Sequence, residues 1–269
     1  MFFMPRTILA TALVLFLFAP PVLAQEAAAV PAPGPTATPA PPTPSEIARG
    51  AGKKLDAFQA KEARAVLEPL ASQAGANADV AIALGRLLEQ EKKYDESAAV
   101  LRKAAGAAPA DARIPLWLGE TLLRARKTAD ADASFRKAAE LAAKTLAARP
   151  DDAGALLVQG SALSRLRRYD EAMVALGKAR DLDGGRPETL YQMGATRAFQ
   201  QKWTDAVTLL SQTLEKDTGM ALAYYYRALS QEKLGRKDLM VVDLDRFVKV
   251  APTAPEAERA RALLAAASR

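Results

Sequence analysis

The chain contains nearly the same ten-residue segment twice. Residues 92–101 read KKYDESAAVL, and residues 167–176 read RRYDEAMVAL. Each has two basic residues, then Tyr-Asp-Glu, a small residue and an apolar stretch with helical spacing. An internal repeat constrains the fold more than any other feature, because repeated units form an array that grows one layer at a time instead of a single globular core.

A series of glycines gives the period of the repeat. Helix-like segments carry Gly85, Gly119, Gly160 and Gly194, Ala228 takes the same place in a fifth, and the spacings are 34, 41, 34 and 34 residues. Twelve residues after each of these positions comes a small residue, and four residues later a large apolar one. The small residues are Ser97, Ala131, Ala172 and Ala206, with Met240 as the exception, and the large ones are Leu101, Phe135, Leu176, Leu210 and Leu244. The pattern predicts helical hairpins in which the glycine faces the small residue where the two helices cross most closely.

This pattern resembles the tetratricopeptide repeat (TPR), a helix-turn-helix unit of 34 residues. The resemblance is to an exported bacterial TPR protein, and it implies an all-α, right-handed superhelical solenoid. Five units are expected to begin near Ala78, Ala112, Ala153, Pro187 and Ala221. A weaker sixth unit precedes them, with Ile47, Ala51, Ala63 and Leu67 in phase, and Pro69 predicts a kink in its second helix.

Three local features refine this expectation. The segment PEAERARALLAAA after Pro252 predicts a C-terminal capping helix, which a solenoid needs to cover its last apolar face. The two quoted segments begin the second helix of their units, where Asp95 and Asp170 suit the helix dipole and can cap. The 41-residue unit has its seven extra residues in 140–149, which predicts a longer second helix that serves as an inert protrusion or as a docking edge.

The N-terminal residues 1–24 predict a signal peptide. Arg6 precedes an apolar run, Pro20-Pro21 interrupts it, and small residues precede Gln25, so cleavage is expected after Ala24. The run is short for a membrane span, although an uncleaved anchor is the alternative. Residues 25–44 are rich in Pro and Ala and predict an extended linker. Residues 45–269 form the predicted solenoid, and the protein is expected to be exported to the periplasm or cell envelope, or secreted.

Composition excludes several kinds of chemistry. The 269 residues include no cysteine and no histidine, which removes thiol nucleophiles, Ser-His-Asp relays and zinc sites built on these residues. The carboxylate pairs, such as Asp151-Asp152, fall in turns between repeats, where Asp is common. The net charge of +6 is spread along the chain among acidic residues, as on solvated helix faces. We therefore expect no catalysis, no metal, no cofactor and no nucleic-acid partner.

In TPR proteins the first helix of each unit lines a concave groove. By resemblance, its candidate partner-binding residues are Leu157, Arg124, Arg165, Tyr191, Phe199 and Tyr225. The aromatic end would anchor a partner segment, and the two arginines would flank it and favour an acidic stretch. The alternative is that these side chains pack between repeats. The clamp of heat-shock chaperones for C-terminal carboxylates needs asparagines in the first helices, and the chain has only Asn77.

The sequence thus predicts a non-catalytic scaffold of the cell envelope that binds a segment of a protein partner in the concave groove. A glycan- or cell-wall-binding module is the alternative, because an apolar and aromatic groove could stack sugar rings. Contact with a membrane is expected only through an uncleaved export signal.

Overall fold

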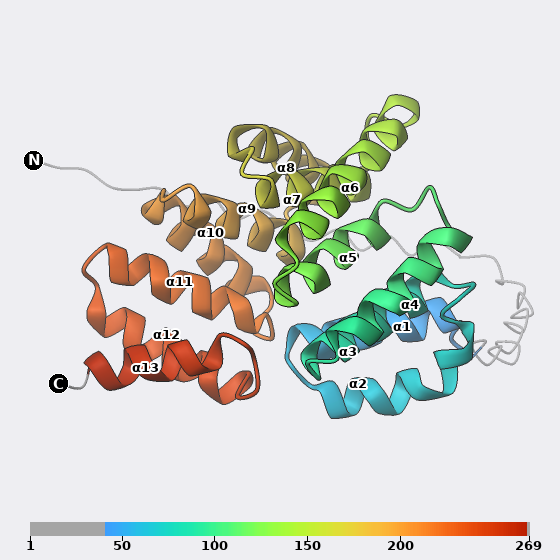
Figure 1. The fold of residues 1–269 in the computed structure, drawn as a ribbon. Helices are drawn as coiled ribbons and strands as arrows, with labels where there is room; N and C mark the ends of the chain where they lie inside the picture. The colour runs from blue at the N-terminus through green and yellow to red at the C-terminus, as the bar shows by residue number, and fades with distance from the viewer. Residues whose placement is uncertain (1–40, 268–269) are drawn as a thin grey trace, which may run out of the picture. The chain divides into compact units, whose positions relative to one another are not determined.

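The computed structural model describes residues 41–267. The predicted signal peptide and residues 25–40 of the predicted linker lie outside the described residues. The described part of the chain contains thirteen α-helices and one short 3₁₀-helix, without a strand (Figure 1). The predicted all-α solenoid of helical hairpins is confirmed.

The helices pair into six consecutive hairpins, which we call units 1 to 6, each with an A helix and a B helix. The A helices are α1 (Pro44–Asp56), α3 (Ala78–Gln90), α5 (Arg113–Arg124), α7 (Ala153–Arg165), α9 (Pro187–Phe199) and α11 (Ala221–Lys233). The B helices are α2 (Ala60–Leu67), α4 (Tyr94–Ala107), α6 (Thr128–Ala148), α8 (Tyr169–Asp183), α10 (Trp203–Lys216) and α12 (Lys237–Val250). The capping helix is α13 (Ala257–Ala267), which packs against α12.

The turn between the A and B helices has the same backbone form in all six units. One residue of each turn has a positive φ, between 54° and 75°: Phe58, Lys92, Arg126, Arg167, Gln201 and Gly235. The residue after it donates its N–H to the carbonyl five residues back, as Lys93 does to Leu88 and Arg168 to Leu163. This closes the C-terminus of each A helix in the manner of a Schellman motif. Unit 1, the weak repeat in the sequence, has the same turn and is in register with the others.

The units stack through the A helices. Each A helix packs against its own B helix and against the A helix of the next unit, and each B helix packs against the following A helix. The A helices therefore lie side by side along one surface, here called the A-helix surface. This is the arrangement expected of a TPR solenoid.

The repeat glycines make room for large side chains. A Cβ added to Gly160 would lie 2.5 Å from Leu176 Cγ and 3.1 Å from the carbonyl oxygen of Ala172. At Gly119 the added Cβ would lie 2.5 Å from a ring atom of Phe135. The small residue of the B helix is buried nearby, but the glycine chiefly faces the large residue four positions later. The expected contact between the glycine and the small residue is therefore only one part of the packing at this crossing.

Two local irregularities agree with the sequence. α2 ends at Leu67 and continues as a 3₁₀-helix (Glu68–Gln73) that contains Pro69, which is the predicted break. α6 has 21 residues, against 14 or 15 in the other B helices of units 2 to 6. Its additional turns keep Ala142 buried. The seven-residue insertion therefore lengthens α6 as predicted.

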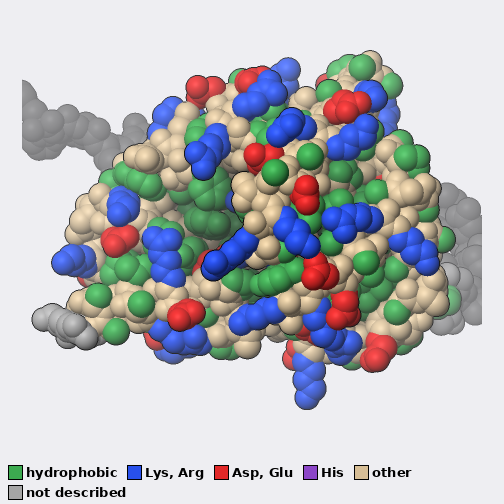
Figure 2. All heavy atoms as spheres, in the orientation of Figure 1, with side chains coloured by type: hydrophobic (Ala, Val, Ile, Leu, Met, Phe, Trp, Pro, Cys, Tyr) green, Lys and Arg blue, Asp and Glu red, His purple; other side chains and the backbone are tan. Residues whose placement is uncertain are grey.

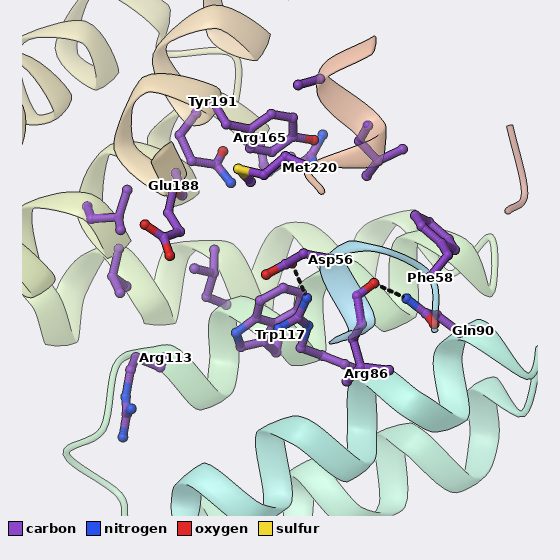
Figure 3. A pocket seen from close by; sticks show the side chains of 18 residues that line it. Asp56, Phe58, Arg86, Gln90, Arg113, Trp117, Arg165, Glu188, Tyr191 and Met220 are labelled. Carbon is purple, nitrogen blue, oxygen red and sulfur yellow. Dashed lines mark hydrogen bonds and ion pairs between the residues drawn. The ribbon is translucent and has the colours of Figure 1, made fainter. Parts of the chain in front are cut away.

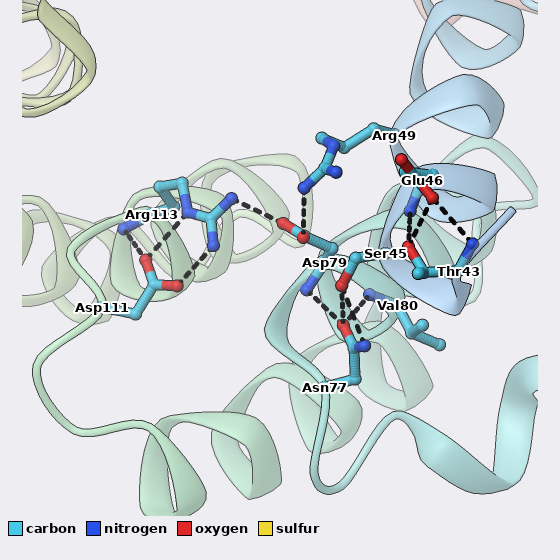
Figure 4. Close-up of polar contacts among 9 residues, drawn as sticks. All are labelled: Thr43, Ser45, Glu46, Arg49, Asn77, Asp79, Val80, Asp111 and Arg113. Atoms are coloured by element: carbon cyan, nitrogen blue, oxygen red, sulfur yellow. Dashed lines mark hydrogen bonds and ion pairs between the residues drawn. The ribbon is translucent and has the colours of Figure 1, made fainter.

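Polar side chains fix the N-termini of the first A helices (Figure 4). Thr43 and Glu46 form a capping box at α1. The Asn77 side chain accepts hydrogen bonds from two backbone N–H groups at the start of α3. Asp79 pairs with Arg49 of α1 at 3.0 Å and with Arg113 of α5 at 2.6 Å, so one carboxylate links three A helices.

The expected capping by Asp95 and Asp170 is wrong. The cap residues of α4 and α8 are Lys93 and Arg168, and neither cap has a side-chain hydrogen bond. Each aspartate lies in the first helical turn and contacts the next unit instead. Asp95 accepts from Lys127 at 2.9 Å, and Asp170 accepts from Gln200 at 2.8 Å.

Candidate functional site

Side chains of the A helices form the surface on which the six candidate residues lie. At one equivalent position in the A helices of units 2 to 6, Ile82 and Tyr225 are buried, with 9% and 4% of their surface exposed, and Leu116, Leu157 and Tyr191 are half-buried. Tyr225 packs in the core, with its ring 5.1 Å from that of Phe247. Tyr225 therefore has the packing role that the alternative interpretation foresaw.

A layer of ion pairs crosses the middle of the A-helix surface. Arg124 donates from Nη1 to Glu256 Oε1 at 2.5 Å, and its Nε lies 3.5 Å from Glu89 Oε1. Glu256 lies directly before α13, 132 positions after Arg124. Arg165 donates from Nε to Glu120 Oε1 at 2.6 Å. The layer joins unit 3 to unit 4 and to the C-terminal loop.

Aromatic rings continue this layer. The ring of Tyr226 lies 5.5 Å from Phe199, edge to face, and 6.3 Å from Tyr191. The guanidinium of Arg165 lies 5.3 Å from the centre of the Phe199 ring. Burial raises the pKa of the Tyr191 and Tyr226 hydroxyls. The layer thus consists of largely buried ion pairs and of aromatic rings packed beside them.

This arrangement corrects one expectation about charge. Arg124 and Arg165 were expected to flank the aromatic end of the groove and to favour an acidic stretch of the partner. Both guanidiniums already have carboxylate partners, and Arg165 also stacks on Phe199. They therefore offer no unpaired positive charge to a partner.

On one side of the layer lies a cavity of about 300 Å³, here called the first cavity (Figure 3). Residues from all six units line it, among them Phe58, Arg86, Trp117, Leu157, Tyr191 and Met220. Arg86 pairs with Asp56 at 2.5 Å and lies 4.4 Å from the centre of the Trp117 ring. Phe58 also packs against the apolar cluster of units 5 and 6. Unit 1 thus reaches the start of α11.

On the other side lies a second cavity of about 450 Å³. It is lined by Ala198, Phe199, Trp203, Tyr225, Tyr226, Leu229, Glu232, Lys233, Glu256 and Arg259. The face shown in Figure 2 is hollowed near α10 and α11, with hydrophobic side chains in the hollow and Lys and Arg around it. The lining of the second cavity thus combines four aromatic residues with four charged residues of both signs.

The six candidate residues fall into three places. Leu157, Arg165 and Tyr191 line the first cavity, Phe199 and Tyr225 line the second, and Arg124 belongs to the layer between them. Sequence reasoning missed Trp117 and Tyr226. Trp117 directly follows Leu116 and Tyr226 directly follows Tyr225, and a run of aromatic residues at 224–226 was the available signal for Tyr226.

Glu89 gives this layer a pH dependence that can be measured. Burial, reinforced by the nearby Glu120, raises the pKa of Glu89 to about 7, although Arg124, Arg86 and a hydrogen bond from Thr121 act in the opposite direction. The folded state therefore keeps a proton that the unfolded chain releases near pH 4.5. Stability should fall as the pH rises from about 4.5 to about 7, and level off above about pH 8.

We expect Glu89→Gln to remove most of this slope. At pH 8 the variant should be more stable than the parent by about 2 kcal/mol, because a neutral amide avoids the cost of ionising a buried carboxyl group. Urea unfolding between about pH 5 and pH 8 measures the effect. Glu171→Gln, at an exposed position on α8, is the control and should leave the slope unchanged. An equal slope in the parent and in Glu89→Gln would contradict the raised pKa.

Residues 41–267 also lack the features of a metal site and of a membrane-spanning helix. That part of the chain has no cluster of three or more acidic side chains arranged to hold a metal ion. No helix in the same residues is long and apolar enough to cross a membrane.

Comparisons with known proteins agree with the fold and the repeat. Three models of the tetratricopeptide repeat match residues 78–111, 118–187 and 222–254, roughly half of the chain together. Among solved structures, a thermophilic TPR protein from Thermus thermophilus is 20% identical, with a TM-score of 0.54 over 70% of this chain and 97% of its own.

Two further structures are similar at lower TM-scores. YrrB, a TPR protein with an unusual peptide-binding site, is 19% identical, with a TM-score of 0.41 over 73% of this chain and 97% of its own. A MamA protein is 19% identical, with a TM-score of 0.38 over 71% and 96%. The repeat models match four of the six hairpins over most of their length, and the turns place all six in one register. TPR units serve in general as scaffolds for protein interaction, and this chain belongs to the tetratricopeptide repeat family.

Proposed function

We propose that this protein is a non-catalytic scaffold that binds a segment of a partner protein on its A-helix surface, at the first and second cavities. The observation that carries the proposal is the first cavity, because side chains from all six units converge on it. A cavity of about 300 Å³ suits one or two inserted side chains better than a whole helix, and apolar anchors in such pockets supply most of the energy of an interface.

The layer between the two cavities shapes how a partner would bind. Arg124 and Glu256 bridge the surface, so a segment that contacts both cavities passes over this pair. An extended segment can do so with side chains directed into each cavity, because residues two apart in an extended chain point the same way. We therefore favour an extended peptide over an amphipathic helix as the bound form.

The test compares two variants in the same unit. Leu157→Glu places a charge in the first cavity, whereas Val174→Glu changes a side chain of α8 that is 62% exposed. The protein from residue 25 onward is immobilised, and envelope extract is passed over each form. A specific partner should be retained by the parent and by Val174→Glu, and its affinity for Leu157→Glu should fall at least about tenfold.

Two results would contradict the proposal. Loss of the partner in Val174→Glu, with full binding in Leu157→Glu, would place the site on the B helices. Sedimentation with purified cell-wall polymer, without any retained protein, would favour the glycan-binding alternative. Circular dichroism of both variants controls for folding.

We also propose that the protein acts in the cell envelope after export and removal of residues 1–24. The support is the short apolar run that Pro20-Pro21 interrupts before the small residues preceding Gln25. Intact-mass measurement on the exported protein should give a chain that begins at Gln25. A membrane-bound species that retains Met1 would instead indicate an uncleaved anchor.

A further inference from the structure

The second cavity combines aromatic rings with a buried carboxylate. Phe199 ends α9, Trp203 begins α10, and Tyr225 and Tyr226 lie on α11, so three consecutive helices bring four rings to one cavity. Phe199 and Tyr226 meet edge to face at 5.5 Å, as do Tyr225 and Tyr226. Rings at steep mutual angles form the walls of a cage instead of a stack. Such walls attract a cation, because the face of each ring is negative.

The charges of this cavity differ in their burial. Glu256 has only 12% of its side chain exposed. Its Oε1 accepts from Arg124, while its Oε2 is buried and has no hydrogen-bond partner. The two basic residues of the lining are exposed: Lys233, at 54%, lies 3.8 Å from Glu232, and Arg259 hydrogen-bonds to the Tyr225 hydroxyl. The most buried charged group of the lining is therefore the Glu256 carboxylate, which is paired with Arg124 through Oε1 and keeps an unsatisfied acceptor at Oε2.

An unsatisfied carboxylate oxygen in such a place favours a ligand that donates hydrogen bonds. A buried acceptor without a partner is costly, and a cationic donor satisfies it better than a neutral one. The aromatic walls favour the same ligand through the ring faces. A volume of about 450 Å³ accommodates a long side chain with its charged end.

We propose that the second cavity binds a lysine or arginine side chain of the partner segment, with the charged end directed at Glu256 and the methylene stem against Phe199, Trp203 and Tyr226. This inference rests on the proposed function, and it reverses the acidic preference expected from the sequence. The reversal follows from the structure, because Glu256 and Glu120 already pair with the two central arginines.

The first experiment uses a pair of probes that differ in charge. Nα-acetyl-lysine amide and Nα-acetyl-norleucine amide are titrated into Trp117→Phe protein, in which Trp203 is the remaining tryptophan and is excited selectively. We expect the lysine probe to bind at least about threefold more tightly than the norleucine probe. Equal affinity, or tighter binding of Nα-acetyl-glutamate amide, would overturn the proposal. Choline is the third probe, and binding of choline without binding of the lysine probe would assign the cavity to a free organic cation instead.

Two variants test the roles of the rim and the walls. Arg259→Gln removes a positive charge from the rim, so it should strengthen binding of the lysine probe about twofold or more. A cavity for anions would show the opposite change. Phe199→Leu keeps the bulk of the side chain but removes a ring face, and it should weaken the lysine probe while leaving the norleucine probe unchanged. Equal weakening of both probes would mean that Phe199 acts only through packing.

The partner experiment separates this inference from the proposed function. If a retained partner depends on Leu157 but binds Phe199→Leu and Arg259→Gln with parental affinity, the scaffold proposal stands and the cation site is wrong. If Leu157→Glu has no effect on the partner, the scaffold proposal fails, whatever the probes show. If the lysine probe is selected and the partner also loses affinity for Phe199→Leu, both are supported.

Discussion

Gly160→Leu is expected to destabilise the protein severely. Even the Cβ of a new side chain would lie 2.5 Å from Leu176 Cγ, 2.9 Å from Leu176 Cδ2 and 3.1 Å from the carbonyl oxygen of Ala172. The remaining atoms of leucine have no space between α7 and α8. Overpacking on this scale should cost about 3 kcal/mol or more, which lowers the melting temperature by about 10 °C.

A matched pair in the same unit controls for the loss of glycine itself. Gly160→Ala should also destabilise, because its Cβ alone makes the close contacts. Gly177, on α8, has no atom within 4 Å of an added Cβ, so Gly177→Ala should stabilise the helix by about 0.5–1 kcal/mol. Thermal unfolding followed by circular dichroism distinguishes the two. Similar shifts for the two alanine variants would show that the crossing of α7 and α8 is not as tight as described.

Arg165→Glu is the second substitution with a large expected effect. By resemblance, Arg165 was expected to flank the aromatic end of a concave groove and to favour an acidic stretch of a partner. In the structure the guanidinium pairs with Glu120, and both side chains are largely buried, at 22% and 17% exposure. The variant would place two carboxylates against each other and remove the stacking on Phe199. Breaking a buried pair in this way should cost about 3 kcal/mol or more.

An exposed ion pair in the next helix is the control. Arg168→Glu breaks the pair with Glu171, in which the two side chains are 54% and 59% exposed, and it should leave stability almost unchanged. A double variant, Arg165→Glu with Glu120→Arg, should recover part of the loss if the pair itself is responsible. Parental stability of Arg165→Glu would mean that the ion-pair layer is open to solvent.

Most of the fold could be predicted from the repeat, because its constraints are local. The spacing of the glycines and the position of each turn are set within one hairpin, and the capping helix packs on its neighbour α12. The structure has each of them where the sequence indicated. The partner of the glycine was less well predicted. Helical side chains lean towards the N-terminus of their helix, so Leu176 reaches back over Gly160 from one turn beyond Ala172.

The site was predictable only in outline. The resemblance to TPR proteins selected residues of the A helices, and some of these do lie at the two cavities, such as Leu157 and Phe199. Their electrostatic environment could not be predicted, because Arg124 meets a carboxylate 132 positions away and Phe58 reaches the cluster of units 5 and 6. Contacts at such large sequence separation depend on the sum of the five small rotations between the six units, and no single unit encodes that sum.

The link between Arg124 and Glu256 alters how the whole array should respond to stress. An open solenoid has contacts only between neighbours, so it frays from its ends and stretches like a spring. Here the loop before α13 is tied to unit 3, and Phe58 of unit 1 packs against the far end of the repeat series. These two long-range contacts join units that are not neighbours, so the array no longer behaves as a linear chain of units. Amide hydrogen exchange in α1 and α11 should therefore be as cooperative as in the central units. A ligand that breaks these long-range contacts should speed exchange at both ends of the array together.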